Sequence, residues 1–164
     1  MIKLKGDLKK RTIELLNQRG ISLEAIAELT FFLQEKYVPN LTMKDCIRSV
    51  QAVVEKREVQ TAVITGIEID IACEKGHFGV ELTDMLMNDY PLYGIDEILV
   101  LSIVNVYGSI GLTNFGYIDK LKPGIMGEID QKGKEDGRCN TFLDDIVGAI
   151  AAAAASRIAH SQEE

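Results

Sequence analysis

The sequence predicts an all-α protein that folds as one compact domain, and three features of its 164 residues support this. Apolar residues recur three and four positions apart over most of the chain, which is the spacing of one face of a helix. Capping residues mark helix starts, and glycine or proline marks helix ends. A chain of this length fits a single domain with a sizeable core. We expect six or seven helices around one central apolar helix, in a single domain spanning residues 1–164.

Two amphipathic helices are predicted ahead of the first proline. Residues 8–19 carry apolar side chains at helical spacing and are followed by Gly20, a common residue just after a helix end. Ser22 is a favourable N-cap for a second helix, which is expected to end before Pro39.

A third helical pattern begins at Thr42, where Asp45 stands three positions later in the spacing of a capping box. Apolar residues continue at helical spacing as far as Ile71, and Gly66 is a candidate bend or break. Residues 63–71 are rich in β-branched side chains, so a strand is the competing interpretation. Helix is preferred because the rest of the chain offers no partner strand.

The middle of the chain contains an almost unbroken apolar run at 98–112, after a short predicted helix at 81–87 and a break at Pro91. A helix that is apolar on all sides lies inside a protein or a membrane. This run has 15 residues, fewer than the roughly 17–25 that a membrane-spanning helix needs. We therefore expect it to be the central helix, followed by a short helix or turn at 114–121.

The end of the chain is expected to contain a loop and a long helix. Two glycines and mixed charges predict a mobile loop over 132–140. Thr141 can cap a last helix over 144–160, with Asp144 at the capping-box spacing. The alanine run at 151–155 gives that helix a smooth surface on which a neighbouring helix can lie closely.

The charge of the chain restricts its partners. The formal net charge is −7, which argues against general nucleic-acid binding because neutralising phosphates needs a basic face. Residues 1–20 hold six basic and two acidic residues, a net charge of +4, which leaves −11 for the remainder. A solvated helix face is one interpretation of this basic segment. Peripheral contact with an anionic membrane, at its inner face, is the other.

The cysteines indicate a reducing environment. Cys46, Cys73 and Cys139 are far apart and form no CxxC pattern, which argues against a disulfide framework or a zinc site. Cys46 and Cys73 lie in apolar helical patterns, so we expect them to be small core residues. The chain begins with charged residues and has no signal-peptide pattern, so a cytoplasmic protein is expected.

Acidic residues at the edges of apolar segments carry the strongest chemical signal. Asp96 and Glu97 precede the apolar run, Asp119 follows it, and Asp144 and Asp145 open the last helix. Carboxylates that gather in an apolar site raise each other's pKa unless a cation offsets them. Hard oxygen ligands suit Mg²⁺, which typically meets one or two carboxylates plus substrate phosphate. A shared Mg²⁺ is therefore one prediction for these residues.

Lys122 is the candidate phosphate-binding cation near these carboxylates. It stands three positions after Asp119, which places both on one face if the segment is helical. The competing interpretation of this whole acidic pattern is helix capping and surface charge. Judged by spacing alone, that plainer interpretation is the better supported one.

Three segments together resemble the phosphatidylglycerophosphatase A family, and in particular its soluble branch, which lacks the membrane-spanning helices of the parent family. They read IDEILVL, FGYIDKLKPGIMGEID and FLDDIVGA, and the overlap covers residues 93–155. The positions that match the family's motifs are Asp96, Glu97, Phe115, Asp119, Lys122, Pro123, Asp130, Asp144, Asp145, Ile146 and Val147.

The resemblance implies Mg²⁺-dependent hydrolysis of the phosphomonoester of phosphatidylglycerophosphate, or of a smaller phosphate ester, on a compact helical domain. The implied metal ligands are Asp96, Glu97, Asp144 and Asp145. The implied catalytic residues are Asp119, Lys122 and Asp145, with Lys122 binding phosphate and Asp119 orienting Lys122 or a ligand water.

The chain departs from the family's pattern at two arginines, which are Gly116 and Gln131 here. Phosphoryl transfer relies on positioned cations, so their loss has to be offset, and Arg138 or Lys132 is the candidate replacement. Two other functions therefore stay open. One is a helical binding or regulatory protein without chemistry, and the other is a structural homo-oligomer joined through the alanine-rich helix.

Overall fold

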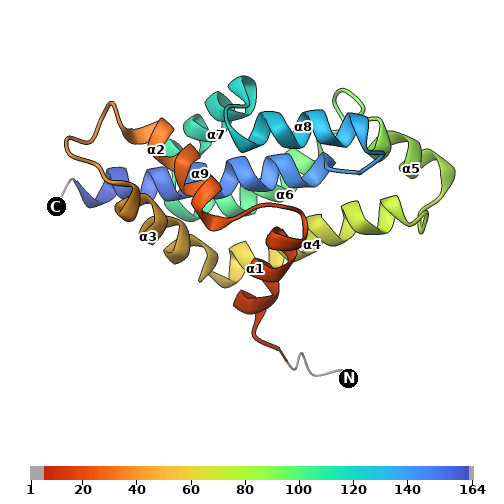
Figure 1. Ribbon diagram of the computed structural model, residues 1–164, viewed down its shortest axis with the longest axis horizontal. Coiled ribbons are helices and arrows are strands. Elements are labelled where there is room, and N and C mark those ends of the chain that lie inside the picture. Colours follow the sequence, from red (N-terminus) through yellow and green to blue (C-terminus); the bar gives the residue numbers. More distant parts are fainter. Residues whose placement is uncertain (1–5, 163–164) are drawn as a thin grey trace.

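The structure is a computed structural model that describes residues 6–162, and helices are the regular secondary structure in that range, joined by turns and loops. The described residues form nine α-helices and one short 3₁₀ helix, η1. The α-helices are labelled in Figure 1. The helices are α1 (Leu8–Gln18), α2 (Leu23–Gln34), α3 (Met43–Val54), α4 (Arg57–Glu74), α5 (Val80–Met87), α6 (Ile95–Val104), η1 (Asn105–Tyr107), α7 (Ser109–Leu121), α8 (Ile125–Glu135) and α9 (Thr141–Ser161). The all-α prediction is confirmed, but the described residues form nine α-helices instead of the six or seven expected.

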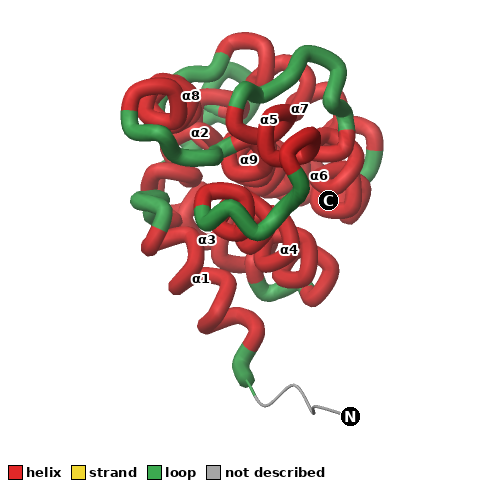
Figure 2. Tube along the Cα trace, turned by 90° about the vertical axis from the view of Figure 1, so that its right-hand side faces the viewer, coloured by secondary structure: helices red, strands yellow, loops and turns green. Residues whose placement is uncertain are grey.

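The last helix, α9, is the centre of the molecule. It packs against α2, α3, α4, α6, α7 and α8, and Figure 2 shows these helices grouped around it. Every residue from Thr141 to Ser156 is buried. Small side chains make this possible: a Cβ added to Gly148 would lie 2.9 Å from the Cε of Met126. Polar groups from α2 and α3 also reach the α9 backbone, since Gln34 donates to the carbonyl of Ala155 at 3.1 Å and Ser49 to that of Ala154 at 2.8 Å.

The expectation that residues 98–112 form the central helix is wrong. The run is divided between α6, η1 and α7, and the chain turns at Gly108, whose φ of 83° lies in the left-handed region that favours glycine. Ile98 is 65% exposed and Leu112 is 49% exposed. Composition alone cannot show which apolar side chains are covered, because coverage depends on the neighbouring helices.

The alanine-rich surface does not form a subunit interface. Ala151 to Ala155 are fully buried against helices of the same chain, so they offer no exposed apolar patch for the homo-oligomer hypothesis. The close helix packing that the run predicts is confirmed, but it occurs within one chain.

The predicted caps of α2 and α3 are present. Ser22 accepts a hydrogen bond from the N–H of Ala25 at 3.1 Å, and the capping box between Thr42 and Asp45 is present. Residues 63–71 are helical, as preferred over a strand, although the pattern is divided near residue 55 into α3 and α4. Gly66 does not break α4, where it packs closely against α6 and α9.

Two local predictions near the start of α9 are wrong. The expected loop over 132–140 is helical as far as Glu135, because α8 continues through it. Thr141 does not cap α9: Asn140 is the N-cap, and the Thr141 hydroxyl donates to the carbonyl of Leu86 at 2.6 Å instead. The N–H groups at the start of α9 are satisfied by Asp70 of α4, which lies far away in the sequence.

The basic first helix is largely engaged within the molecule. Lys9 pairs with Glu55, Arg11 with Glu68, and Arg19 with Glu74 at 2.6 Å. Lys3 and Lys5, which contribute to the predicted basic segment, lie outside the described residues. The three cysteines are buried and unpaired, which confirms the prediction for Cys46 and Cys73. No helix within residues 6–162 is long and apolar enough to cross a bilayer.

Candidate metal and phosphate site

A small acidic cleft of about 170 Å³ lies where the start of α9 meets the start of α6 and the end of α7. The charged residues that line it are Asp89, Asp96, Glu97, Asp119, Lys122, Asp144 and Asp145. The structure therefore brings together in one cleft six residues singled out from the sequence, from three separate segments. Asp89 also lines the cleft, although it was not a candidate from the sequence. We call this feature the acidic cleft.

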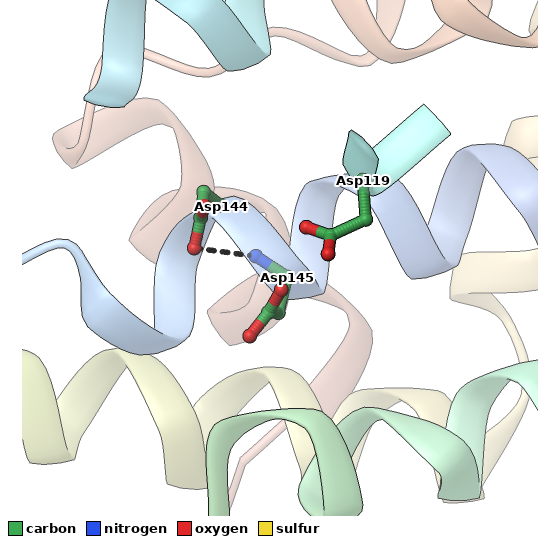
Figure 3. A group of neighbouring side chains, drawn as sticks. All are labelled: Asp119, Asp144 and Asp145. Atoms are coloured by element: carbon green, nitrogen blue, oxygen red, sulfur yellow. Dashed lines mark hydrogen bonds between the residues drawn. The ribbon is translucent and has the colours of Figure 1, made fainter. Parts of the chain in front are cut away.

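Three aspartates form the centre of the acidic cleft. Asp119, Asp144 and Asp145 each offer a carboxylate oxygen, and these oxygens lie within 4.8 Å of one another. Figure 3 shows the Asp119 carboxylate, from α7, directed toward α9, which carries the other two. Asp144 also accepts the N–H of Asp145 at 2.9 Å, which orients its side chain in the first turns of α9. Among the described residues this is the one acidic group with spacing suited to a metal ion.

The electrostatics of this triad favour a cation. Burial raises the pKa of Asp145 well above its ordinary value, and the neighbouring Asp144 and Asp96 raise it further. Burial also raises the pKa of Asp144, against the opposing effect of Lys122. The pKa of a carboxylate is raised when it is buried beside other carboxylates and too few positive charges lie nearby. The donor set consists entirely of carboxylate oxygens, which are the ligands that Mg²⁺ prefers.

Lys122 supplies the positive charge in the acidic cleft. Its Nζ donates to the Asp144 carboxylate at 2.7 Å and to the Asp119 carboxylate at 3.0 Å. Burial alone would lower the pKa of Lys122, but these two carboxylates more than offset that effect and raise it. Its backbone has a φ of 45° at the C-cap of α7, a left-handed conformation that is uncommon outside glycine. Lys122 is the one basic residue among the described residues that line the cleft.

Asp96 and Glu97 occupy different positions in the cleft. Asp96 is buried and contacts Asp145, and its carboxylate accepts the N–H of Glu97 at 3.0 Å. Glu97 is exposed, at the edge of the cleft. Both lie in the first turn of α6, where the helix dipole favours negative charge.

Sequence reasoning missed Asp89, which follows α5 and lines the cleft. Its φ of 46° places it in the left-handed region, which aspartate tolerates better than most residues. Burial raises its pKa, and the neighbouring Asp96 adds to this. The signal in the sequence was weak, because an Asn-Asp pair before Tyr-Pro is also an ordinary turn.

Sequence reasoning also missed Asp70, the fully buried aspartate of α4. Its carboxylate accepts the N–H of Leu143 at 2.9 Å and of Phe142 at 3.1 Å, and Cys139 donates its thiol at 3.4 Å. Asp70 therefore anchors the first turn of α9, immediately before Asp144 and Asp145. An acidic residue among the apolar residues of a buried helix is the signal that could have identified it.

The candidate replacements for the missing arginines lie outside the acidic cleft. Arg138 lines an adjoining cavity of about 350 Å³, which shares Asp89 and Asp144 with the cleft. Lys132 is exposed and lines neither. A Cβ added to Gly116 would meet nothing within 4 Å, and Gln131 is exposed and hydrogen-bonded to Glu135.

Known proteins resemble this chain along nearly its whole length. Residues 14–160 match the family model described as phosphatidylglycerophosphatase A. Protein YutG of Bacillus subtilis is 55% identical over 145 residues, which cover 88% of this chain and 86% of that protein. Protein YpjQ of the same organism is 54% identical over 153 residues, covering 93% of this chain and 85% of that protein. The crystal structure of the low temperature requirement C protein from Listeria monocytogenes has a TM-score of 0.93 and 52% identity, covering 98% of this chain and 99% of that one.

These matches far exceed what a shared helical architecture alone would give, and they agree with the resemblance carried by the three acidic motifs. The chain belongs to the phosphatidylglycerophosphatase A family.

Proposed function

We propose that this protein is a Mg²⁺-dependent phosphomonoesterase that hydrolyses the terminal phosphate of phosphatidylglycerophosphate or of a smaller phosphate ester. The observation that carries the proposal is the buried triad of Asp119, Asp144 and Asp145 with Lys122 hydrogen-bonded between two of its members. In a family described as a phosphatidylglycerophosphatase, this combination of a divalent-cation site and a fixed ammonium group suits a phosphate monoester.

The fit of a metal ion rests on the carboxylates themselves. Asp144 and Asp145 would hold it from α9 and Asp119 from α7, with Asp96 and Glu97 completing the set from α6. When bound, a divalent cation polarises the phosphoryl oxygens and lowers the pKa of an attacking water. It also removes the repulsion that raises the pKa of Asp145.

Lys122 is the proposed phosphate-binding residue. Its side chain already lies in the cleft as a fixed cation, so a phosphate oxygen can exchange for one of its carboxylate partners without a change of backbone. Asp119 then orients the ammonium group through its 3.0 Å hydrogen bond. A donor held in place before the reaction needs little reorganisation in the transition state. Arg138 is proposed as a second phosphate contact, reached through the adjoining cavity.

A binding or regulatory role without catalysis is the second candidate. The observation that favours it is the single cation in the acidic cleft, since Gly116 and Gln131 replace the family's arginines. Such a protein would bind Mg²⁺ and a phosphate ester without turning the ester over.

Phosphate release by the purified protein decides between the two. We expect Mg²⁺-dependent release from phosphatidylglycerophosphate in detergent or from a water-soluble phosphate monoester. Lys122→Met should lower kcat about 100-fold or more, as expected for removal of a group that stabilises transition-state charge. Lys120→Met, at an exposed position two residues away, is the matched control and should retain wild-type activity.

Two results would contradict the phosphatase proposal. One is the absence of phosphate release from either substrate when Mg²⁺ binding is demonstrable. The other is an equal loss of activity in the variants at positions 122 and 120.

A further inference from the structure

Exposed apolar side chains gather in one segment of this chain. Eleven large hydrophobic residues are exposed in the described structure, and seven of them fall between residues 90 and 121. These seven are Tyr90, Leu92, Ile95, Ile98, Leu112, Tyr117 and Leu121. We call five of them the α6–α7 face, namely those that line the acidic cleft or lie next in sequence to residues that line it: Tyr90, Leu92, Ile95, Ile98 and Leu121. Exposed apolar side chains grouped beside a cleft are typical of an interaction site.

The middle of the same segment lacks charge. From Ile98 to Ile118 there are 21 consecutive residues without an acidic, basic or histidine side chain, whereas charged residues make up 26% of the whole chain. Moving a charged side chain out of water is costly, and moving an apolar one is favourable. Between the charged residues at the start of α6 and those at the end of α7, the outer sides of these helices can therefore leave water without that cost.

The α6–α7 face lies beside the acidic cleft. Tyr90 and Leu92 line the cleft itself, and Leu92 is fully exposed with a φ of 64°. Ile95 and Ile98 flank the acidic pair that lies in the cleft, and Leu121 directly precedes Lys122. Figure 2 shows α6 and α7 on the same side of α9.

We propose that the α6–α7 face docks this protein on the surface of a lipid bilayer, with the acidic cleft facing the membrane. The choice of a lipid substrate rests on the proposed function. A bilayer fits better than a protein partner, because a protein seated on this face would cover the cleft, whereas a bilayer presents lipid phosphates to it. Exposed apolar and aromatic side chains suit insertion at the level of the headgroups.

The basic first helix is the less suitable membrane contact. Its described cations pair with acidic residues of the same chain, most closely Arg19 with Glu74 at 2.6 Å. Cations neutralised in this way contribute little to attraction by anionic lipids. Docking through the α6–α7 face would instead respond weakly to salt, since it depends on apolar contact.

Vesicle sedimentation tests the docking surface. The variant is the double substitution Ile95→Gln and Ile98→Gln, and the matched control is Val80→Gln, an 82% exposed apolar residue on α5, outside the face. With vesicles of phosphatidylcholine and phosphatidylglycerol, we expect the double variant to partition about 100-fold more weakly, at about tenfold per isoleucine. The control should bind as the wild type does. Equal melting temperatures establish that the variants are folded.

Two results would overturn the docking surface. One is vesicle binding that is absent in the wild type or unchanged in the double variant. The other is a wild-type dimer in sedimentation velocity that becomes a monomer in the double variant, because the occupant of the face would then be a second copy of the chain.

Activity on a soluble and on a membrane-bound substrate distinguishes failure of the docking surface from failure of the proposed phosphatase function. The double variant should hydrolyse a water-soluble phosphate monoester at the wild-type rate but act slowly on phosphatidylglycerophosphate in vesicles. If the wild type hydrolyses neither substrate yet loses vesicle binding through the double substitution, the docking surface stands and the phosphatase proposal fails. If both substrates are hydrolysed equally well by wild type and variant, the docking surface fails and the phosphatase stands.

Discussion

Replacing Asp145 with asparagine tests whether the triad is a metal site or a structural feature. Burial and the neighbouring Asp144 and Asp96 raise the pKa of Asp145, so its side chain is close to neutral in the metal-free protein. Asparagine has nearly the same shape and no charge. We therefore expect Asp145→Asn to change the free energy of unfolding of the metal-free protein by less than about 1 kcal/mol.

The effect of Mg²⁺ should differ sharply between the two proteins. A ligand at 100 times its dissociation constant stabilises the folded state by about 2.7 kcal/mol. For a chain of this size, that corresponds to a rise in melting temperature of about 5–11 °C. If the loss of one charged ligand weakens binding about 100-fold, the same Mg²⁺ concentration stabilises Asp145→Asn by only about 0.4 kcal/mol.

Thermal unfolding with and without MgCl₂, at constant ionic strength, measures both quantities. Asp136→Asn is the matched control, because Asp136 is an exposed aspartate that does not line the acidic cleft. The reasoning is refuted if Mg²⁺ leaves the wild type unchanged, or if it stabilises the wild type and Asp145→Asn equally. A large loss of stability in metal-free Asp145→Asn would show instead that this carboxylate supports the fold.

Two further substitutions test how the start of α9 is supported. Burial raises the pKa of Asp70 to about 8, so between about pH 5 and 7 the folded state holds a proton that the unfolded state has lost. Wild-type stability should therefore fall with rising pH, by about 1.4 kcal/mol per unit relative to Asp70→Asn, in urea titrations across that range. A constant difference would mean that the N–H groups of Phe142 and Leu143 keep the carboxylate ionised. Gly66→Ala places a Cβ 2.6 Å from the Cδ1 of Ile146, and should destabilise the protein by about 1–3 kcal/mol in the same assay, whereas an unchanged midpoint would mean that the contact relaxes freely.

Local chemistry in the sequence determined the class of the fold and the starts of α2 and α3. Ser22 and Thr42 each satisfy N–H groups within three residues of themselves, so a cap can be read without knowing the rest of the fold. The same is true of the ion pair between Lys122 and Asp119, which are three residues apart. Interactions of this range depend on spacing along the chain, which the sequence states directly.

The convergence of the acidic residues could be predicted only through the family's motifs. Spacing alone favoured separate caps and surface charges, because nothing local links Asp119 to Asp144 or Asp145. Their carboxylates meet because α7 packs along α9, and this packing depends on glycine and alanine side chains that let helices approach closely. Asp70 shows the same limit, since its partners lie more than 70 residues later in the chain.

The identity of the central helix was decided by tertiary structure. Hydrophobicity favoured residues 98–112 over residues 141–161 as the central helix, because alanine is only weakly apolar whereas isoleucine and leucine are strongly apolar. Yet α9 is buried because its small side chains admit neighbours on every side, and Ile98 and Leu112 are exposed because no neighbour covers them. Burial is a property of the packed assembly of helices, so the sequence determined that these segments are helices and apolar, and only the fold decided which of them faces solvent.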